Sequence, residues 1–124
     1  MTTTILLATA LWHGLAAWHF GITPARTLAR TTRVRPVDAI PTELFRFLAG
    51  LNVALVVLAL LAARSASAEP VRIAAITLAV ANASQLAQDV RVARLGLIHG
   101  PMFRTILLGD ALFTALNAWV ALKT

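Results

Sequence analysis

Four long apolar stretches, separated by short polar segments, make up most of this chain. They run from about residue 5 to 20, 44 to 63, 71 to 90 and 103 to 122. A helix needs roughly 20 residues to cross hydrocarbon about 30 Å thick, and each stretch is close to that length, although the first is slightly short. They lack the alternation of barrel strands, the other structure that satisfies its backbone inside lipid. The pattern predicts an all-α fold, an integral membrane four-helix up-and-down bundle in a single domain.

The composition also indicates a membrane protein. Of the 124 residues, 59% are hydrophobic and 13% are charged, against about 25% charged in average soluble domains, and the mean hydropathy is +0.79. The segments outside the four stretches are too short for an extramembrane catalytic domain. Because the chain has no cysteine, thiol catalysis, disulfides and thiolate-bound clusters are excluded.

Glycine and proline separate the predicted helices. The first helix is expected to end near Gly21, with Pro24 just beyond it. Pro70 and Pro101 stand where the third and fourth helices begin, since proline is tolerated in a first turn. Residues 66–68 resemble a signal-peptidase site, but they lie too far from the start for an ordinary signal peptide. All four helices are therefore expected to be retained.

Basic residues are distributed unequally between the two sides of such a bundle. The formal net charge is +6, and the first and third loops of a four-span chain lie on one side. That side carries eight basic residues and the other carries three: Arg26, Arg30, Arg33, Arg35, Arg46, Arg91, Arg94 and Arg104 against Arg64, Arg72 and Lys123. By the positive-inside rule, loops 21–43 and 91–102 are cytoplasmic and both termini are outside. The preference for arginine over lysine suggests a bacterial inner (cytoplasmic) membrane, and the basic residues form no face of the kind that binds nucleic acid.

Polar residues within the apolar stretches gather at similar depths. With about 1.5 Å per residue, one polar residue from each helix lies roughly 10 to 12 Å from the cytoplasmic end. On the third and fourth helices, further polar residues recur at helical spacing, so each set occupies one face, which should point inward. The predicted polar layer consists of His13, Asn52, Asn82, Gln85, Asp89, Asp110, Thr114 and Asn117.

Asp110 is the main functional candidate in this layer. An aspartate near the centre of a span costs about 2.5 to 3.5 kcal/mol, so it is expected to face the bundle interior and find a partner. If His13 lies opposite Asp110, the two side chains could share a proton. The same residues can instead form structural hydrogen bonds that hold the helices together, each contributing about 0.6 to 2 kcal/mol. Both interpretations stay open.

Other chemistry is weakly supported. His13 and His19 are six residues apart, which does not place two imidazoles side by side on one helical face, so no metal site is predicted. No catalytic triad order, phosphate loop or paired-carboxylate spacing is present. Asp38 and Glu43 are expected to pair with loop arginines, and His99 to be a solvated loop residue.

Three stretches resemble small DoxX-like four-helix membrane proteins of bacteria. These are residues 20–25 after the first helix, residues 45–55 in the second, and residues 88–117 with an acid inside the fourth. The resemblance implies the four-helix fold and an acid in the last helix, which Asp110 matches, and some members accompany quinone-linked oxidoreductases. The polar pair Gln88-Asp89 near the end of the third helix, followed by the Gly100-Pro101 turn, also resembles the ergosterol-biosynthesis scaffold proteins.

Three functional hypotheses follow from the sequence. The leading one is a non-catalytic or accessory membrane protein that binds a quinone or other isoprenoid, with Asp110, His13 and Gln85 at the polar end of the pocket; no tightly bound cofactor is predicted. Its partners would be membrane lipids, together with a larger membrane complex or further copies in a homo-oligomer. The second is a membrane-embedded enzyme, an isomerase or oxidoreductase subunit, that uses Asp110 and His13. The third is an oligomeric ion-coupled transporter.

Overall fold

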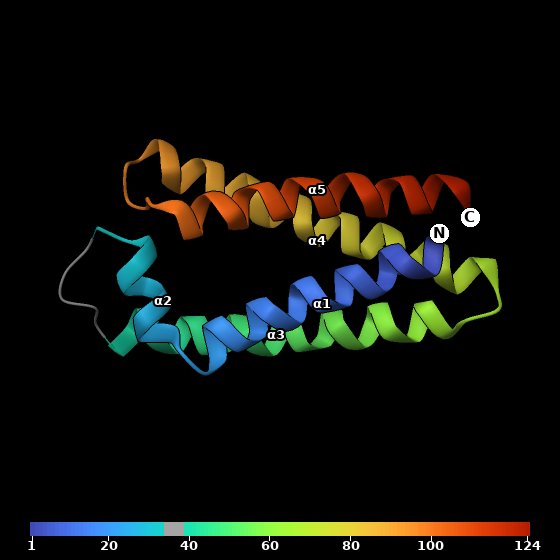
Figure 1. Ribbon diagram of the computed structural model, residues 1–124, viewed down its shortest axis with the longest axis horizontal. Helices are drawn as coiled ribbons and strands as arrows, with labels where there is room; N and C mark the ends of the chain where they lie inside the picture. The colour runs from blue at the N-terminus through green and yellow to red at the C-terminus, as the bar shows by residue number, and fades with distance from the viewer. Residues whose placement is uncertain (34–38) are drawn as a thin grey trace.

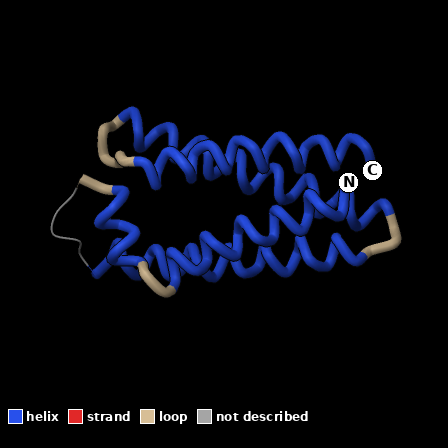
Figure 2. Tube along the Cα trace, in the orientation of Figure 1, coloured by secondary structure: helices blue, strands red, loops and turns tan. Residues whose placement is uncertain are grey.

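Helices account for nearly all of the described chain. The computed structural model describes residues 1–33 and 39–124 (Figures 1 and 2). Its helices are α1 (Thr2–Gly21), α2 (Pro24–Thr31), α3 (Ala39–Arg64), α4 (Ala68–Arg94) and α5 (Pro101–Lys123). Outside the helices, the described residues contain a single isolated β-bridge, between Thr32 and Ile98. The predicted all-α fold is confirmed, and each of the four apolar stretches lies within one of the long helices.

The four long helices form two pairs. α1 packs along α3 and α4 packs along α5, and successive long helices run in opposite directions (Figure 1). Both termini and the α3–α4 turn lie at one end of the molecule, which we name the terminal end. α2 and the α4–α5 turn lie at the opposite end, named here the basic end after its arginines: Arg26, Arg30, Arg33, Arg46, Arg91, Arg94 and Arg104. There Glu43 pairs with Arg46, while Arg35 and Asp38 are outside the described residues.

The segment from 21 to 43 was expected to be a loop, and the structure corrects this. It contains α2, and α3 begins at Ala39, five residues before the predicted stretch. α2 is bent by 98° from α1, and Pro24 occupies its first turn. The sequence gives little sign of α2 because isolated helices of eight residues are unstable. Its stability comes from burying Thr27, Leu28 and Thr31 against the bundle.

α2 connects the two helix pairs at the basic end. The His99 N–H donates to the Thr31 carbonyl at 2.7 Å, and the Arg33 N–H donates to the Leu97 carbonyl at 3.2 Å. Gly100 makes this approach possible, since it has a φ of +96° and a Cβ there would lie 3.1 Å from the Arg30 carbonyl oxygen. Any other residue would be strained in that conformation and crowded by α2.

The hydrophobic core occupies the terminal end. Its fully buried large residues are Leu6, Leu78 and Val120, from α1, α4 and α5. The rest of the core is largely alanine, on α1, α3 and α4: Ala10, Ala59, Ala62, Ala74 and Ala75. Such small side chains let helices approach closely. The bundle is therefore tightly closed at the terminal end, and its open space lies nearer the basic end.

The outer surface of the bundle is apolar while several polar groups are buried. Each long helix exposes large aliphatic side chains, for example Leu11 (65%), Leu61 (63%), Val80 (60%) and Leu108 (67%). This distribution is opposite to that of a soluble domain, where contiguous apolar surface is limited. α3 and α5 are each long and apolar enough to cross a membrane, and α1 together with α2 meets the same test as a bent pair. α4 carries too many polar residues to do so by composition.

Candidate functional site

One face of α1 provides the polar contacts that join the helix pairs. Thr9, Trp12 and His13 follow each other at i, i+3 and i+4, so they project from the same side of the helix. Thr9 and His13 are fully buried and Trp12 is partly buried. Together they form hydrogen bonds to α3, α4 and α5. α1, the shortest of the four long helices, is therefore the centre of the polar layer.

His13 bridges α3 and α4. The Asn52 Nδ2 donates to the Leu48 carbonyl at 2.9 Å, so its Oδ1 faces the ring and accepts from His13 Nδ1 at 2.7 Å. The opposite ring nitrogen, Nε2, accepts from Asn82 Nδ2 at 3.5 Å. One donating and one accepting nitrogen is the arrangement of a neutral imidazole. Three of the four residues predicted at one depth thus meet directly.

The fourth, Asp110, is held by Trp12. The indole Nε1–H donates to Asp110 Oδ1 at 3.0 Å, and the ring stacks on Phe113 with centroids 5.6 Å apart. Gly109 makes room for the indole, because a Cβ there would lie 2.7 Å from the ring Cζ3 and closer still to two neighbouring ring atoms. Trp12 therefore lies flat against α5 over a position where a side chain would clash.

Nearer the terminal end, a second bond joins α1 to α5. Asn117 Nδ2 donates to Thr9 Oγ1 at 3.1 Å, and both residues are completely buried. Thr114 was predicted in the same layer, but its hydroxyl donates to the carbonyl of Asp110 on its own helix at 2.7 Å. Interhelical bonds of this kind contribute about 0.6 to 2 kcal/mol each inside a membrane. The structural interpretation, in which polar residues form hydrogen bonds that hold helices together, therefore applies to Thr9 and Asn117.

Asp89 and Asp110 form a carboxyl pair across the α4–α5 interface. Their side chains lie within hydrogen-bonding reach of each other. Each has an Oδ2 that is buried without a donor among the described residues, and the third oxygen of this kind is Asn82 Oδ1. A proton shared between the two carboxyl groups would satisfy both of these Oδ2 atoms, whereas two bare acceptors would leave each one unpaired.

The pairing of His13 with Asp110 that the sequence left open is not among the hydrogen bonds of the described residues. Both imidazole nitrogens are directed to asparagines, and the Asp110 carboxyl contacts Trp12 and Asp89 instead. The physical reason is that the larger indole, one residue before His13, occupies the space beside the acid. Among the described residues, no group of three or more histidine or carboxylate side chains is placed to hold a metal ion.

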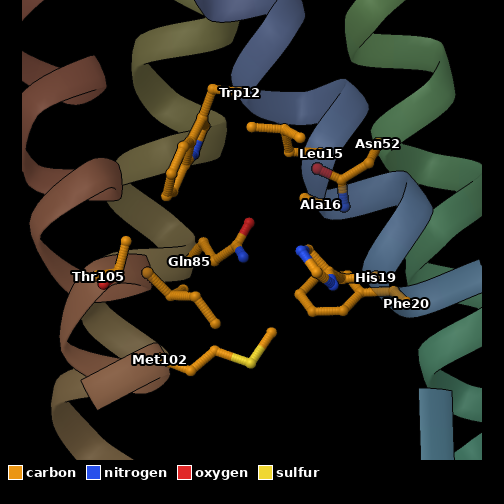
Figure 3. A pocket seen from close by; sticks show the side chains of 10 residues that line it. Trp12, Leu15, Ala16, His19, Phe20, Asn52, Gln85, Met102 and Thr105 are labelled. Carbon is orange, nitrogen blue, oxygen red and sulfur yellow. The ribbon is translucent and has the colours of Figure 1, made fainter. Parts of the chain in front are cut away.

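Two cavities lie between the helix pairs. The larger has a volume of about 620 Å³ and is lined by residues from all five helices, including Phe45, Leu51 and Phe103. The smaller, about 210 Å³, lies beside Trp12 (Figure 3). Four residues line both cavities, one from each long helix: Phe20, Asn52, Gln85 and Ile106. The two cavities are therefore neighbours that share a boundary.

The cavity walls contain only some of the predicted site residues. Gln85 and Asn52 line both cavities, and Asp89 lines the larger. In Figure 3 the Gln85 amide stands in the centre of the space between α1 and α5. The remaining five predicted residues do not line either cavity: His13, Asn82, Asp110, Thr114 and Asn117. All of them except Thr114, which bonds within its own helix, form contacts between helices.

Sequence reasoning missed two participants in the polar layer. Thr9 was not selected, because threonine is common in apolar helices and one hydroxyl carries little signal. Trp12 was missed because nothing in the sequence linked it to Asp110. A signal was present in the i, i+3, i+4 spacing of Thr9, Trp12 and His13.

Comparisons with known proteins provide no assignment: no family model, curated protein or solved structure matches this chain.

Proposed function

We propose that the chain is an integral membrane protein whose four long helices all cross the bilayer. α3 and α5 have the composition of spans, and α1 and α4 pack between and along them with similar lengths. α4 can enter lipid despite its polar residues because Asn82 is fully buried and Asp89 partly so. The basic end would face the cytoplasm of a bacterium and both termini the outside. Membership of the DoxX-like group is a hypothesis within this proposal.

The function that the geometry supports best is binding of one small lipid-like molecule. The observation that carries it is the cavity of about 620 Å³ between the helix pairs, which falls within the roughly 300 to 1,000 Å³ of typical ligand pockets. Its walls are mostly aliphatic and aromatic, with a few polar groups. An apolar wall with few convergent polar groups is the usual form of a small-molecule site. A quinone or another isoprenoid has the matching chemistry.

Gln85 and Asn52 would orient such a ligand. They face the boundary between the two cavities from α4 and α3. The Gln85 amide can donate to a ligand carbonyl, and its position in the centre of the space in Figure 3 leaves it accessible. In this role the protein is accessory: it holds the molecule for a larger membrane complex or for another copy of the chain, without chemistry of its own.

The test compares two alanines of α4. Ala81 lines the larger cavity, and Ala83, two residues away and exposed, does not. We expect Ala81→Phe to reduce the amount of lipid-like molecule that co-purifies in mild detergent, as measured by native mass spectrometry and lipid extraction. Ala83→Phe should retain the wild-type profile. An Ala81→Phe protein that is folded by circular dichroism and keeps that profile would overturn the proposal.

The ion-coupled transporter remains a second candidate because one observation favours it. Asp89 and Asp110 place two carboxyl groups inside the bundle, and an intramembrane carboxyl is the usual requirement of proton-coupled transport. pH-dependent flux in proteoliposomes that disappears in Asp110→Asn would support this function. The enzyme hypothesis that used His13 with Asp110 has less support, because the two side chains form hydrogen bonds to different partners.

A further inference from the structure

A third hollow, named here the vestibule, opens at the basic end beside the cavities. It has a volume of about 130 Å³ and lies between α1, α2 and the start of α5. Two cationic groups line it, Arg26 and Arg30, which are one helical turn apart on α2. Thr23 and Thr27 line it as well, and both of their hydroxyls donate to the His19 carbonyl. Unlike the two cavities, the vestibule therefore has cationic groups, and their N–H donors and positive charge are what an anion requires.

The vestibule adjoins both cavities. His19 and Met102 line the vestibule and the smaller cavity, and Thr27 lines the vestibule and the larger one. In Figure 3, His19 and Met102 stand on opposite sides of the same space, below Gln85. The three hollows are thus direct neighbours, cationic at the basic end and mostly apolar inside the bundle.

α2 is fixed firmly enough to hold this site. The Thr27 hydroxyl donates to the His19 carbonyl at 2.9 Å, which ties the helix to the end of α1. The Thr31 carbonyl accepts from the His99 N–H at 2.7 Å, which ties it to the turn before α5. Among the described residues, neither Arg26 nor Arg30 forms an ion pair with a carboxylate. Asp89 lines the larger cavity but not the vestibule. The two guanidinium groups are therefore available to an external anion.

We propose that the vestibule binds the phosphate or carboxylate of an anionic amphiphile whose single hydrocarbon or isoprenoid chain extends into the cavities. The cationic vestibule would bind the anionic head of this ligand, and the apolar walls of the neighbouring cavities would bind its hydrocarbon chain. This inference rests on the proposed lipid-binding function and narrows its ligand class. A neutral quinone would fill the cavities and leave the two arginines without a partner.

A simpler explanation is that Arg26 and Arg30 only set the orientation of the protein in the membrane. Arg91 and Arg94 provide the matched control, because they lie at the same end, are exposed, and line neither the vestibule nor the cavities. A double substitution at either pair removes the same charge from the same side. The two explanations therefore predict different results for the two double variants.

The experiment measures binding of hexadecyl phosphate and hexadecanol in nonionic detergent by native mass spectrometry. Hexadecyl phosphate should bind the wild type and R91Q/R94Q equally, and bind R26Q/R30Q about tenfold or more weakly, which corresponds to at least about 1.4 kcal/mol. Hexadecanol should bind all three proteins alike. Circular dichroism and gel filtration establish that each variant is folded.

Three outcomes would overturn the inference. Equal losses in both double variants would indicate general surface charge, and displacement of hexadecyl phosphate by inorganic phosphate would indicate a site for the free ion. Equal binding of both probes to every variant would show that the head is not recognised, although the lipid-binding function would survive. That function fails separately, when Ala81→Phe leaves the co-purified lipid profile unchanged.

Discussion

Gly109 provides the sharpest test of how α1 packs on α5. A methyl group added at this position would meet the six-membered ring of Trp12, at 2.7 Å from Cζ3 and closer to Cη2 and Cζ2. The indole cannot yield freely, because it also stacks on Phe113 and donates to Asp110. Gly109→Ala should therefore displace the ring and break the bond to the acid.

The expected cost can be worked from these contacts. Overpacking a filled interior costs about 1 to 3 kcal/mol, and loss of an interhelical hydrogen bond in a membrane adds about 0.6 to 2 kcal/mol. We expect Gly109→Ala to lower the free energy of unfolding by about 2 to 5 kcal/mol in total. Gly50→Ala is the control, because a Cβ there meets nothing within 4 Å on the exposed side of α3. Its effect should stay within about 0.5 kcal/mol.

The assay is a double-mutant cycle in mixed micelles. Unfolding by increasing fractions of sodium dodecyl sulfate is followed by circular dichroism, which does not depend on tryptophan emission. In a Trp12→Leu background the clash disappears, so Gly109→Ala should cost less than about 1 kcal/mol there, leaving a coupling energy of about 1 to 5 kcal/mol. The reasoning would be refuted if Gly109→Ala cost no more than Gly50→Ala, or cost the same with and without the indole.

Three further predictions concern orientation, the carboxyl pair and the imidazole. Because the chain has no native cysteine, Ser65→Cys should react with a membrane-impermeant maleimide on intact cells and His99→Cys only after permeabilisation; the reverse pattern would invert the proposed topology. Asp89→Asn supplies an N–H donor to the unpaired oxygen of Asp110, so the free energy of unfolding in the detergent titration should be unchanged or about 1 kcal/mol higher. A loss of about 2 kcal/mol or more, which is the cost of leaving a buried polar group unpaired, would contradict the pairing of the two carboxyl groups. Asn52→Leu removes the acceptor of the buried imidazole and should cost about 1 to 3 kcal/mol in the same titration, so a loss below about 0.5 kcal/mol would contradict the hydrogen bond.

The apolar pattern alone determined the helical class and the approximate extent of the long helices. Hydrophobic runs near the length of a span, with proline and glycine between them, leave few alternatives to helices when no barrel pattern is present. The same pattern identified most of the buried polar residues, since a charged or amide side chain in such a run must turn inward. His13, Asn82, Asp110 and Asn117 are all essentially inaccessible in the folded chain.

The partners of those residues were decided only by the tertiary structure. Depth along a helix follows from counting residues, but which neighbour a side chain meets depends on how each helix is rotated and tilted. Thus Trp12, rather than His13, reached Asp110, because Gly109 left a space that only the indole fills. α2 and the hollows beside it also depend on packing, because a helix of eight residues is stable only when it contacts the rest of the fold.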